Sequence, residues 1–158
     1  MRNFIILFFA LITNSFLAQT KQETSNWLIE KLNENNTVND GTDSETFCSI
    51  SNGNIISKNY NRTFKTNTIF GIPIKSVKKI IVYKNKFSFN FLLECESNCV
   101  NEQINNIVGK KEENIGKVMT LKINIEDSTL YDRIPKSLIH LIKLYGGNPK
   151  LVLKKEPF

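Results

Sequence analysis

The segment KFSFNFLLEC, residues 86–95, carries an apolar side chain at every second position. Because side chains in a β-strand point alternately to its two faces, Phe87, Phe89, Phe91, Leu93 and Cys95 share one face. Three successive phenylalanines on one face indicate a strand packed against a core, although the same alternation describes the wall of a small barrel around an apolar ligand. The segment therefore predicts a strand, with a filled core and a cavity lined by Phe87, Phe89 and Phe91 as alternatives.

Six further segments have strand character and bring the total to about seven antiparallel strands. The dipeptide Asn52-Gly53 favours a type I′ hairpin between the first two of them. The lysine- and glutamate-rich segment Gly109–Gly116 is expected to be an exposed loop. The six segments are Phe47–Ser51, Asn54–Tyr60, Arg62–Phe70, Lys78–Lys84, Cys99–Val108 and Lys117–Ile125.

Two segments with helical periodicity flank the strands. Residues 20–35 place Trp27, Leu28 and Leu32 near helical spacing, and residues 127–146 gather their apolar side chains within one arc before Gly146-Gly147 ends the pattern. The tail from Lys150 is expected to be loose. The predicted fold class is α+β, with an N-terminal helix, a bent sheet or partly open barrel, and an amphipathic C-terminal helix.

The first eighteen residues have the pattern of a secretory signal peptide. Arg2 precedes an uncharged apolar stretch of about fourteen residues, which is too short to span a bilayer as a helix, and Ala18 permits cleavage. An uncleaved anchor is the alternative, because Phe16 is bulky for a signal peptidase. Cleavage leaves one globular domain, 19–158, with no stable membrane span, secreted or periplasmic; it comprises a helix and linker (19–44), an antiparallel sheet (45–125) and a C-terminal helix (127–146).

Three cysteines remain after the predicted cleavage, namely Cys48, Cys95 and Cys99. An oxidising compartment favours disulfides, and an odd number leaves one thiol unpaired. Cys95 and Cys99 are close enough in sequence to bridge a tight turn. A bridge from Cys48 to either of them is the rival, and the sequence does not decide between these pairings.

Basic residues are concentrated in the middle of the chain. Residues 46–93 hold eight lysines and arginines and no acid, which suggests an anion-binding patch, although lysines at alternating strand positions also describe an ordinary solvated face. Export argues against nucleic acid as the partner. The residues of this candidate patch are Lys75, Lys78, Lys79, Lys84 and Lys86.

The chain lacks a recognisable catalytic or cofactor-binding motif. Its single histidine, His140, falls on the polar side of the predicted C-terminal helix, away from any nucleophile. We therefore expect no enzyme activity, no cofactor and no metal. The leading hypothesis is an exported domain that binds a partner protein or an envelope component, and the alternative is a carrier of a small apolar ligand inside a β-barrel.

Two motifs, ETSNWLIEKL at 23–32 and YDRIPKSLIHLIKLYGG at 131–147, resemble those of small secreted bacterial proteins of unassigned function. The order of a helix, about seven strands and a final helix also resembles a pleckstrin-homology-like domain. That resemblance implies a bent sheet closed at one end by the last helix. The basic residues that bind phosphoinositides in true pleckstrin-homology domains form no matching motif here, and a lipocalin-like barrel is the alternative fold.

Overall fold

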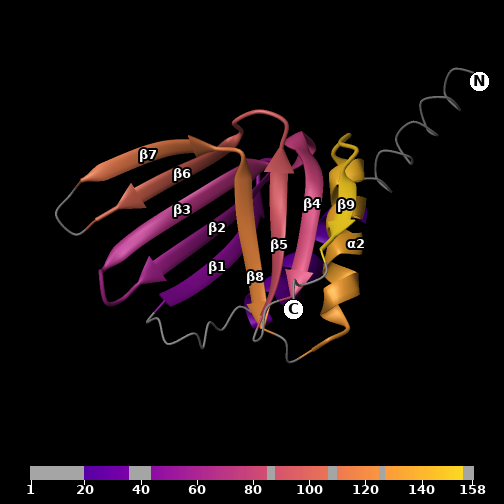
Figure 1. Cartoon of the computed structure of the whole chain (residues 1–158), viewed down its shortest axis with the longest axis horizontal. Coiled ribbons are helices and arrows are strands. Elements are labelled where there is room, and N and C mark those ends of the chain that lie inside the picture. Colours follow the sequence, from indigo (N-terminus) through magenta and orange to yellow (C-terminus); the bar gives the residue numbers. More distant parts are fainter. Residues whose placement is uncertain (1–19, 36–43, 85–87, 107–109, 125–126, 155–158) are drawn as a thin grey trace, which may run out of the picture.

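The computed structural model describes residues 20–35, 44–84, 88–106, 110–124 and 127–154. Within these ranges the chain forms an N-terminal helix, nine strands in two sheets, and a C-terminal helix (Figure 1). This arrangement confirms the predicted α+β class, although a ninth strand follows the C-terminal helix in the chain. The expected signal peptide and the segment 36–43 lie outside the described residues.

Five strands form the first sheet, sheet A, in which neighbouring strands are antiparallel. In spatial order they are β1 (Ser44–Ser51), β2 (Asn54–Asn61), β3 (Thr66–Pro73), β6 (Val100–Asn105) and β7 (Lys111–Gly116). Four strands form sheet B, whose last pair is parallel. In spatial order they are β8 (Val118–Asn124), β5 (Ser88–Cys95), β4 (Val77–Lys84) and β9 (Lys150–Leu153).

Three strands of sheet A continue into three strands of sheet B at a common corner. The order β3-β6-β7 in one sheet matches the order β4-β5-β8 in the other, and the short 3-10 turn η1 (Ile74–Ser76) links β3 to β4. Backbone bonds hold the corner, because the Cys95 and Cys99 N–H groups donate to the carbonyls of Lys117 and Gly116, both at 2.9 Å. The two sheets are therefore one sheet that turns sharply, and their strands run in different directions (Figure 1).

The turned sheet does not close on itself. A lipocalin-like barrel, or a partly open one, is therefore the wrong description, and the bent sheet is the right one. The physical reason is that β1 and β8 lie at the edges of different sheets and do not pair with each other in the registers of the described strands.

The core lies on the inner face of the bend. Phe89 and Phe91 of β5 are 2% and 0% exposed, and Phe91 pairs with Val82 of β4 on one side and with Leu121 of β8 on the other. Alternation in β5 thus places Phe91 between two apolar neighbours. Each of these large side chains contributes about 1.5–3 kcal/mol by leaving water.

Two helices cover this core. The N-terminal helix (residues 20–34) buries Leu28 and Leu32, which lie one turn apart. The C-terminal helix, α2 (Leu130–Leu144), contacts β4 and η1, and lies beside sheet B in Figure 1. Its buried side chains recur at helical spacing, as predicted: Leu130, Ile134, Pro135, Leu138, Leu141 and Ile142.

Asn33 covers part of the exposed edge of sheet A. Its side-chain amide donates to the Cys48 carbonyl at 3.0 Å, and its side-chain oxygen accepts from the Cys48 N–H at 2.7 Å. Cys48 lies in the edge strand β1, so the Asn33 side chain makes the pair of hydrogen bonds that a neighbouring strand would otherwise make. The Asn124 N–H also donates to the Asn35 carbonyl at 2.8 Å, which fastens the end of the N-terminal helix to β8.

Several strand boundaries differ from the predictions. The hairpin at Asn52-Gly53 is confirmed, since both residues have positive φ angles, 50° and 72°. The expected loop Gly109–Gly116 is wrong, because β7 pairs with β6 there. The expected loose tail is also wrong over β9, which pairs with β4, so the described strands number nine rather than about seven. The third strand is shifted, with a turn at 62–65 before it.

We predict that replacing Asn33 with alanine destabilises the fold by about 1–3 kcal/mol, since it leaves two backbone groups of Cys48 without their partner. Asn26→Ala is the matched control, because Asn26 is an exposed asparagine on the same helix. Urea unfolding followed by circular dichroism measures both. Equal stability of the two variants would show that the Asn33 contacts contribute nothing.

We predict that the double variant Cys95→Ser, Cys99→Ser unfolds with a free energy lower by about 2 kcal/mol, from the chain-entropy cost of a loop of about five residues. Wild-type protein treated with a reductant is the matched comparison, and it should lose a similar amount. The same unfolding free energy with and without reductant would contradict the prediction.

Candidate functional site

The cysteines settle the disulfide question. Cys95 and Cys99 are bonded to each other, which confirms the predicted pairing, and Cys48 is a free, buried thiol, so the rival pairings are wrong. The disulfide spans the corner between β5 and β6 and thus joins sheet B to sheet A. Burial raises the pKa of Cys48 to about 11. The thiol is therefore neutral near physiological pH and suited to packing rather than to nucleophilic chemistry.

A pocket of about 340 Å³ opens beside the disulfide. Lys75 and Lys78 of the predicted anion patch line it, together with the acidic Glu96. The other described members lie apart, since Lys79 forms an ion pair with Glu94 at 3.0 Å and Lys84 lies 5.9 Å from the centre of the Phe89 ring. Lys86 lies outside the described residues. The structure thus brings together two of the five lysines.

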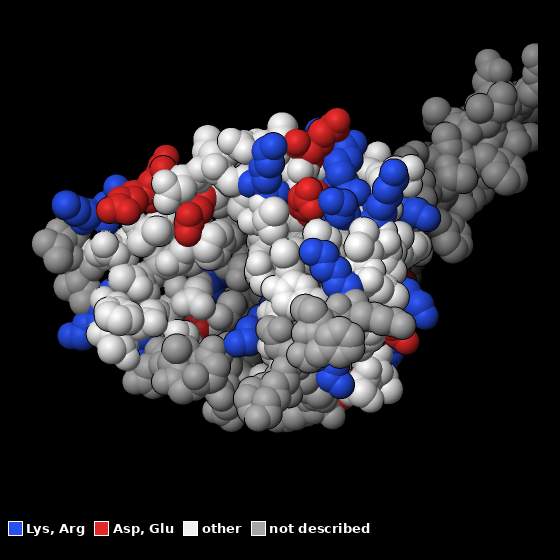
Figure 2. Space-filling view, in the orientation of Figure 1, with Lys and Arg blue, Asp and Glu red and all other residues white. Residues whose placement is uncertain are grey.

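Charge is distributed unevenly over the surface. Acidic side chains gather near the β6–β7 end of the face shown in Figure 2, where basic side chains lie beside them. Basic side chains are more numerous over the sheet B side of that face (Figure 2). The β6–β7 end therefore presents both signs of charge, whereas the sheet B side is the more basic of the two.

The predicted cavity-lining residues lie in the core. Phe89 packs against Tyr131 of α2, with ring centres 5.0 Å apart, and Phe91 is surrounded by the buried cluster. Neither ring lines the pocket beside the disulfide, the pocket between the two helices, or the groove between the N-terminal helix and β1. Phe87 lies outside the described residues.

A second pocket, of about 380 Å³, lies between the two helices. Trp27 and Thr24 line one side, and Lys136, Ser137 and His140 line the other. The guanidinium of Arg133 stacks over the Trp27 ring at 5.0 Å, a cation–π contact that joins the helices. His140 is exposed on α2, as the helical spacing predicts.

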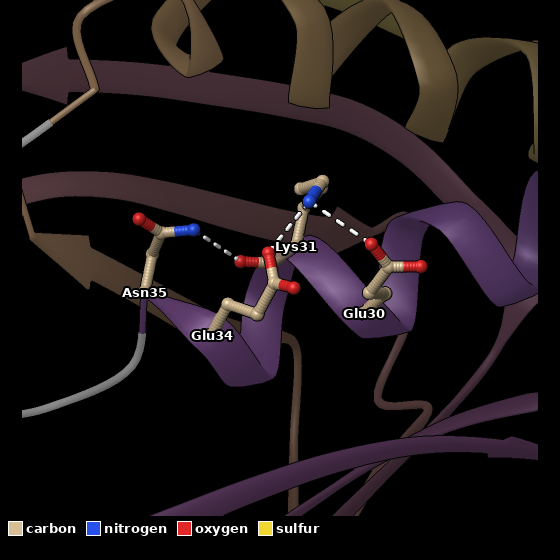
Figure 3. A network of polar contacts seen from close by, with 4 residues as sticks. All are labelled: Glu30, Lys31, Glu34 and Asn35. Atoms are coloured by element: carbon tan, nitrogen blue, oxygen red, sulfur yellow. Dashed lines mark hydrogen bonds and ion pairs between the residues drawn. The ribbon is translucent and has the colours of Figure 1, made fainter.

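A polar network lies near the end of the N-terminal helix (Figure 3). The Lys31 ammonium pairs with Glu34 at 2.6 Å and with Glu30 at 3.0 Å, and the Asn35 side chain donates to the Lys31 carbonyl. The hydrogen bonds to Glu34 and then to Glu30 raise the pKa of Lys31. Every contact in the network is made within one helical turn, so it stabilises the helix end rather than forming a site.

A larger groove, of about 680 Å³, lies between the first turns of the N-terminal helix and the end of β1. We call it the helix–strand groove. Ile29, Ile50 and Tyr145 are partly buried and pack on the core, and the Ser25 side chain is only 8% exposed. The other lining residues are polar: Lys21, Gln22, Asn26, Glu30, Ser49 and Asn52.

Sequence reasoning missed this groove. Its walls come from the N-terminal helix, from the β1–β2 hairpin, and from Tyr145 at the far end of the chain. One signal was present, because Ile29 is an apolar residue that falls about 100° around the helix from the buried Leu28. An apolar side chain just outside the core stripe indicates a second partly covered surface.

The outer face of sheet A carries exposed apolar side chains. The strand registers place Phe47, Ile56, Tyr60, Ile69 and Ile115 on the face opposite the core. Phe47, Tyr60 and Ile115 are 55%, 42% and 65% exposed. We call these five residues the outer face. Glu45 at its margin pairs with Arg62, so part of the surrounding charge is neutralised.

Comparisons with known proteins do not identify the chain: no family model, no curated protein and no solved structure matches it. Among the described residues, no helix has the length and apolar character needed to cross a membrane. In the same residues, no three histidine, cysteine, aspartate or glutamate side chains come together as a metal site.

We predict that the stability of the protein falls between about pH 9 and pH 11 partly because of Cys48. The thiol ionises with a pKa of 9.0 when unfolded and about 11 when folded, so the unfolded state loses its proton first as pH rises. The full effect is about 3 kcal/mol, present below pH 9 and lost at pH 11. Unfolding free energies of wild type and Cys48→Ala, measured across this range, should converge by that amount, whereas parallel curves would contradict the assignment.

Proposed function

We propose that this chain is an exported, non-catalytic domain that binds a partner protein through the outer face of sheet A. The observation that carries the proposal is the exposure of Phe47, Tyr60 and Ile115 on one face of a well-formed sheet. Phe47 and Tyr60 lie on the neighbouring strands β1 and β2, and Ile115 lies on the opposite edge strand β7. Exposed aromatic side chains are typical of protein contact sites, in which they are enriched. The registers also place the charged Lys58 and Glu113 on this face. An envelope component is the less favoured partner, since a surface that mixes aromatic and charged side chains is typical of protein contacts.

Export is the second part of the proposal. Its supports are the signal-like residues 1–18 and the Cys95–Cys99 disulfide, a bond that persists in oxidising compartments. A secreted or periplasmic location follows. There, a partner protein is a more accessible target than nucleic acid.

A pleckstrin-homology-like relationship also stays a proposal. Its support is a bent, mainly antiparallel sheet covered by a C-terminal helix. The nine described strands exceed the roughly seven that this resemblance implies. A carrier of a small apolar ligand has no observation to favour it, because Phe89 and Phe91 pack in the core.

We predict that the double variant Phe47→Ser, Tyr60→Ser loses at least about tenfold in affinity for its partner, as expected for two aromatic contact residues. Cross-linking and pull-down from the native host's envelope or culture medium identify the partner, and titration with the purified partner gives the affinity. Stability should change by about 0.5 kcal/mol or less, since both side chains are exposed.

The control is Thr120→Ala, which alters an exposed residue of sheet B and should bind like wild type. Recovery of no specific protein, or a partner that binds the double variant unchanged, would overturn the assignment of the outer face. Turnover of a substrate by the purified protein would overturn the non-catalytic role.

A further inference from the structure

The edge strand β1 has a backbone N–H and carbonyl, those of Ile50, that face the helix–strand groove. In an antiparallel pair, backbone groups point alternately toward the partner strand and away from it. The contacts with Asn33 show that the Cys48 N–H and carbonyl point away from β2. Ile50 lies two residues further along the same regular strand, so its N–H and carbonyl point outward as well.

These Ile50 groups face the groove rather than a side chain. Ile50 lines the groove, and no partner for its outward N–H or carbonyl is found among the described residues. At Cys48 the helix lies close enough for Asn33 to replace a neighbouring strand, whereas at Ile50 a groove of about 680 Å³ separates strand from helix. The space and the unused donor and acceptor therefore occur together.

We propose that the helix–strand groove binds an extended segment of a partner polypeptide, which adds as a short strand beside β1 at Ile50. The inference rests on the proposed partner-binding function and assigns it a second contact site. A polypeptide is the occupant that matches a backbone N–H and carbonyl side by side, since each of its residues offers the complementary pair. An apolar side chain of the segment would pack on Ile29, Ile50 and Tyr145.

Charge gives the occupant a preferred sequence. Lys21 lies at one end of the groove, with its ammonium 4.9 Å from the centre of the Tyr145 ring, and Glu30 lies further along the helix. The two positions are nine residue steps apart along the helix, which is about 13 Å, or the length of about four extended residues. Glu30 is already paired with Lys31, whereas the ammonium of the half-buried Lys21 contacts only the Tyr145 ring among the described residues and so offers a cation to the groove. The segment therefore carries an acidic side chain or a terminal carboxylate at the Lys21 end.

The test begins with a display library of random nine-residue peptides, selected on protein purified after expression of the full-length gene. The best peptides are synthesised and their affinities measured by calorimetry. Selected sequences should share an acidic group near one end and an apolar residue inside. Lys21→Glu should weaken them by about tenfold, and a peptide with lysine in place of the acidic residue should recover affinity for this variant.

Backbone pairing is tested directly by Ile50→Pro. Proline removes an N–H, and at an edge strand whose N–H points away from the ladder it is tolerated. The variant should bind the peptides at least about tenfold more weakly. If it fails to fold in a thermal melt, a scan of peptides N-methylated at single positions replaces it, and one position should lose about tenfold while its immediate neighbours change little.

Failure of this inference differs from failure of the proposed function. Peptides that bind Ile50→Pro and Ile29→Glu as wild type does but lose affinity for Phe47→Ser, Tyr60→Ser would overturn the groove assignment and leave the outer face standing. A library that yields no peptide tighter than about 1 mM would also overturn it. Weaker peptide binding by Ile50→Pro and Ile29→Glu supports the groove assignment, whatever the result for the outer-face variant.

Discussion

The corner between the two sheets is the constraint on which the rest of the structure depends. Strands β3, β6 and β7 continue into β4, β5 and β8 at this line, so a single turned sheet supplies both walls of the core. The turn is held by backbone bonds from Cys95 and Cys99 and by the disulfide between them. Without the corner, the inner faces of the two sheets would not share one core, and the helices would have no concave surface to cover.

A turned but open sheet leaves strand edges that must be managed. The β7 edge carries Lys111, Glu112 and Glu113, and charged side chains discourage pairing with another chain. The β1 edge is covered at Cys48 by Asn33, and the end of β8 is fastened to the N-terminal helix through Asn35. The stretch of β1 at Ile50 differs from all of these, since a groove lies beside it in place of a covering group.

The sequence predicts elements whose signal is local. Alternation in 86–95 locates β5, and Asn52-Gly53 locates the first hairpin, because neighbouring residues alone determine both. The sequence does not predict strand β7, because its residues are mostly exposed and show no apolar alternation. Strand β9 escaped because it is four residues long and pairs in parallel with the distant β4. The open edges and the groove depend on which segments, distant in the sequence, come together in the fold. The periodicity of a sequence carries no information on such long-range contacts.

The outer face and the groove are adjacent because β1 contributes to both. Phe47 projects from β1 onto the outer face, and Ile50 borders the groove three residues later. A partner strand beside Ile50 would bury the surface of only a few residues, whereas a stable protein contact typically covers about 800 Å² on each partner. The outer face supplies apolar contact area, which does not fix the orientation of a partner. The backbone N–H and carbonyl of Ile50 fix the direction and register of a partner strand but add little contact area. A partner that occupies the groove and continues across β1 onto Phe47 would combine backbone pairing with apolar contact. Strand β1 would then contribute both to the affinity for the partner and to its specificity.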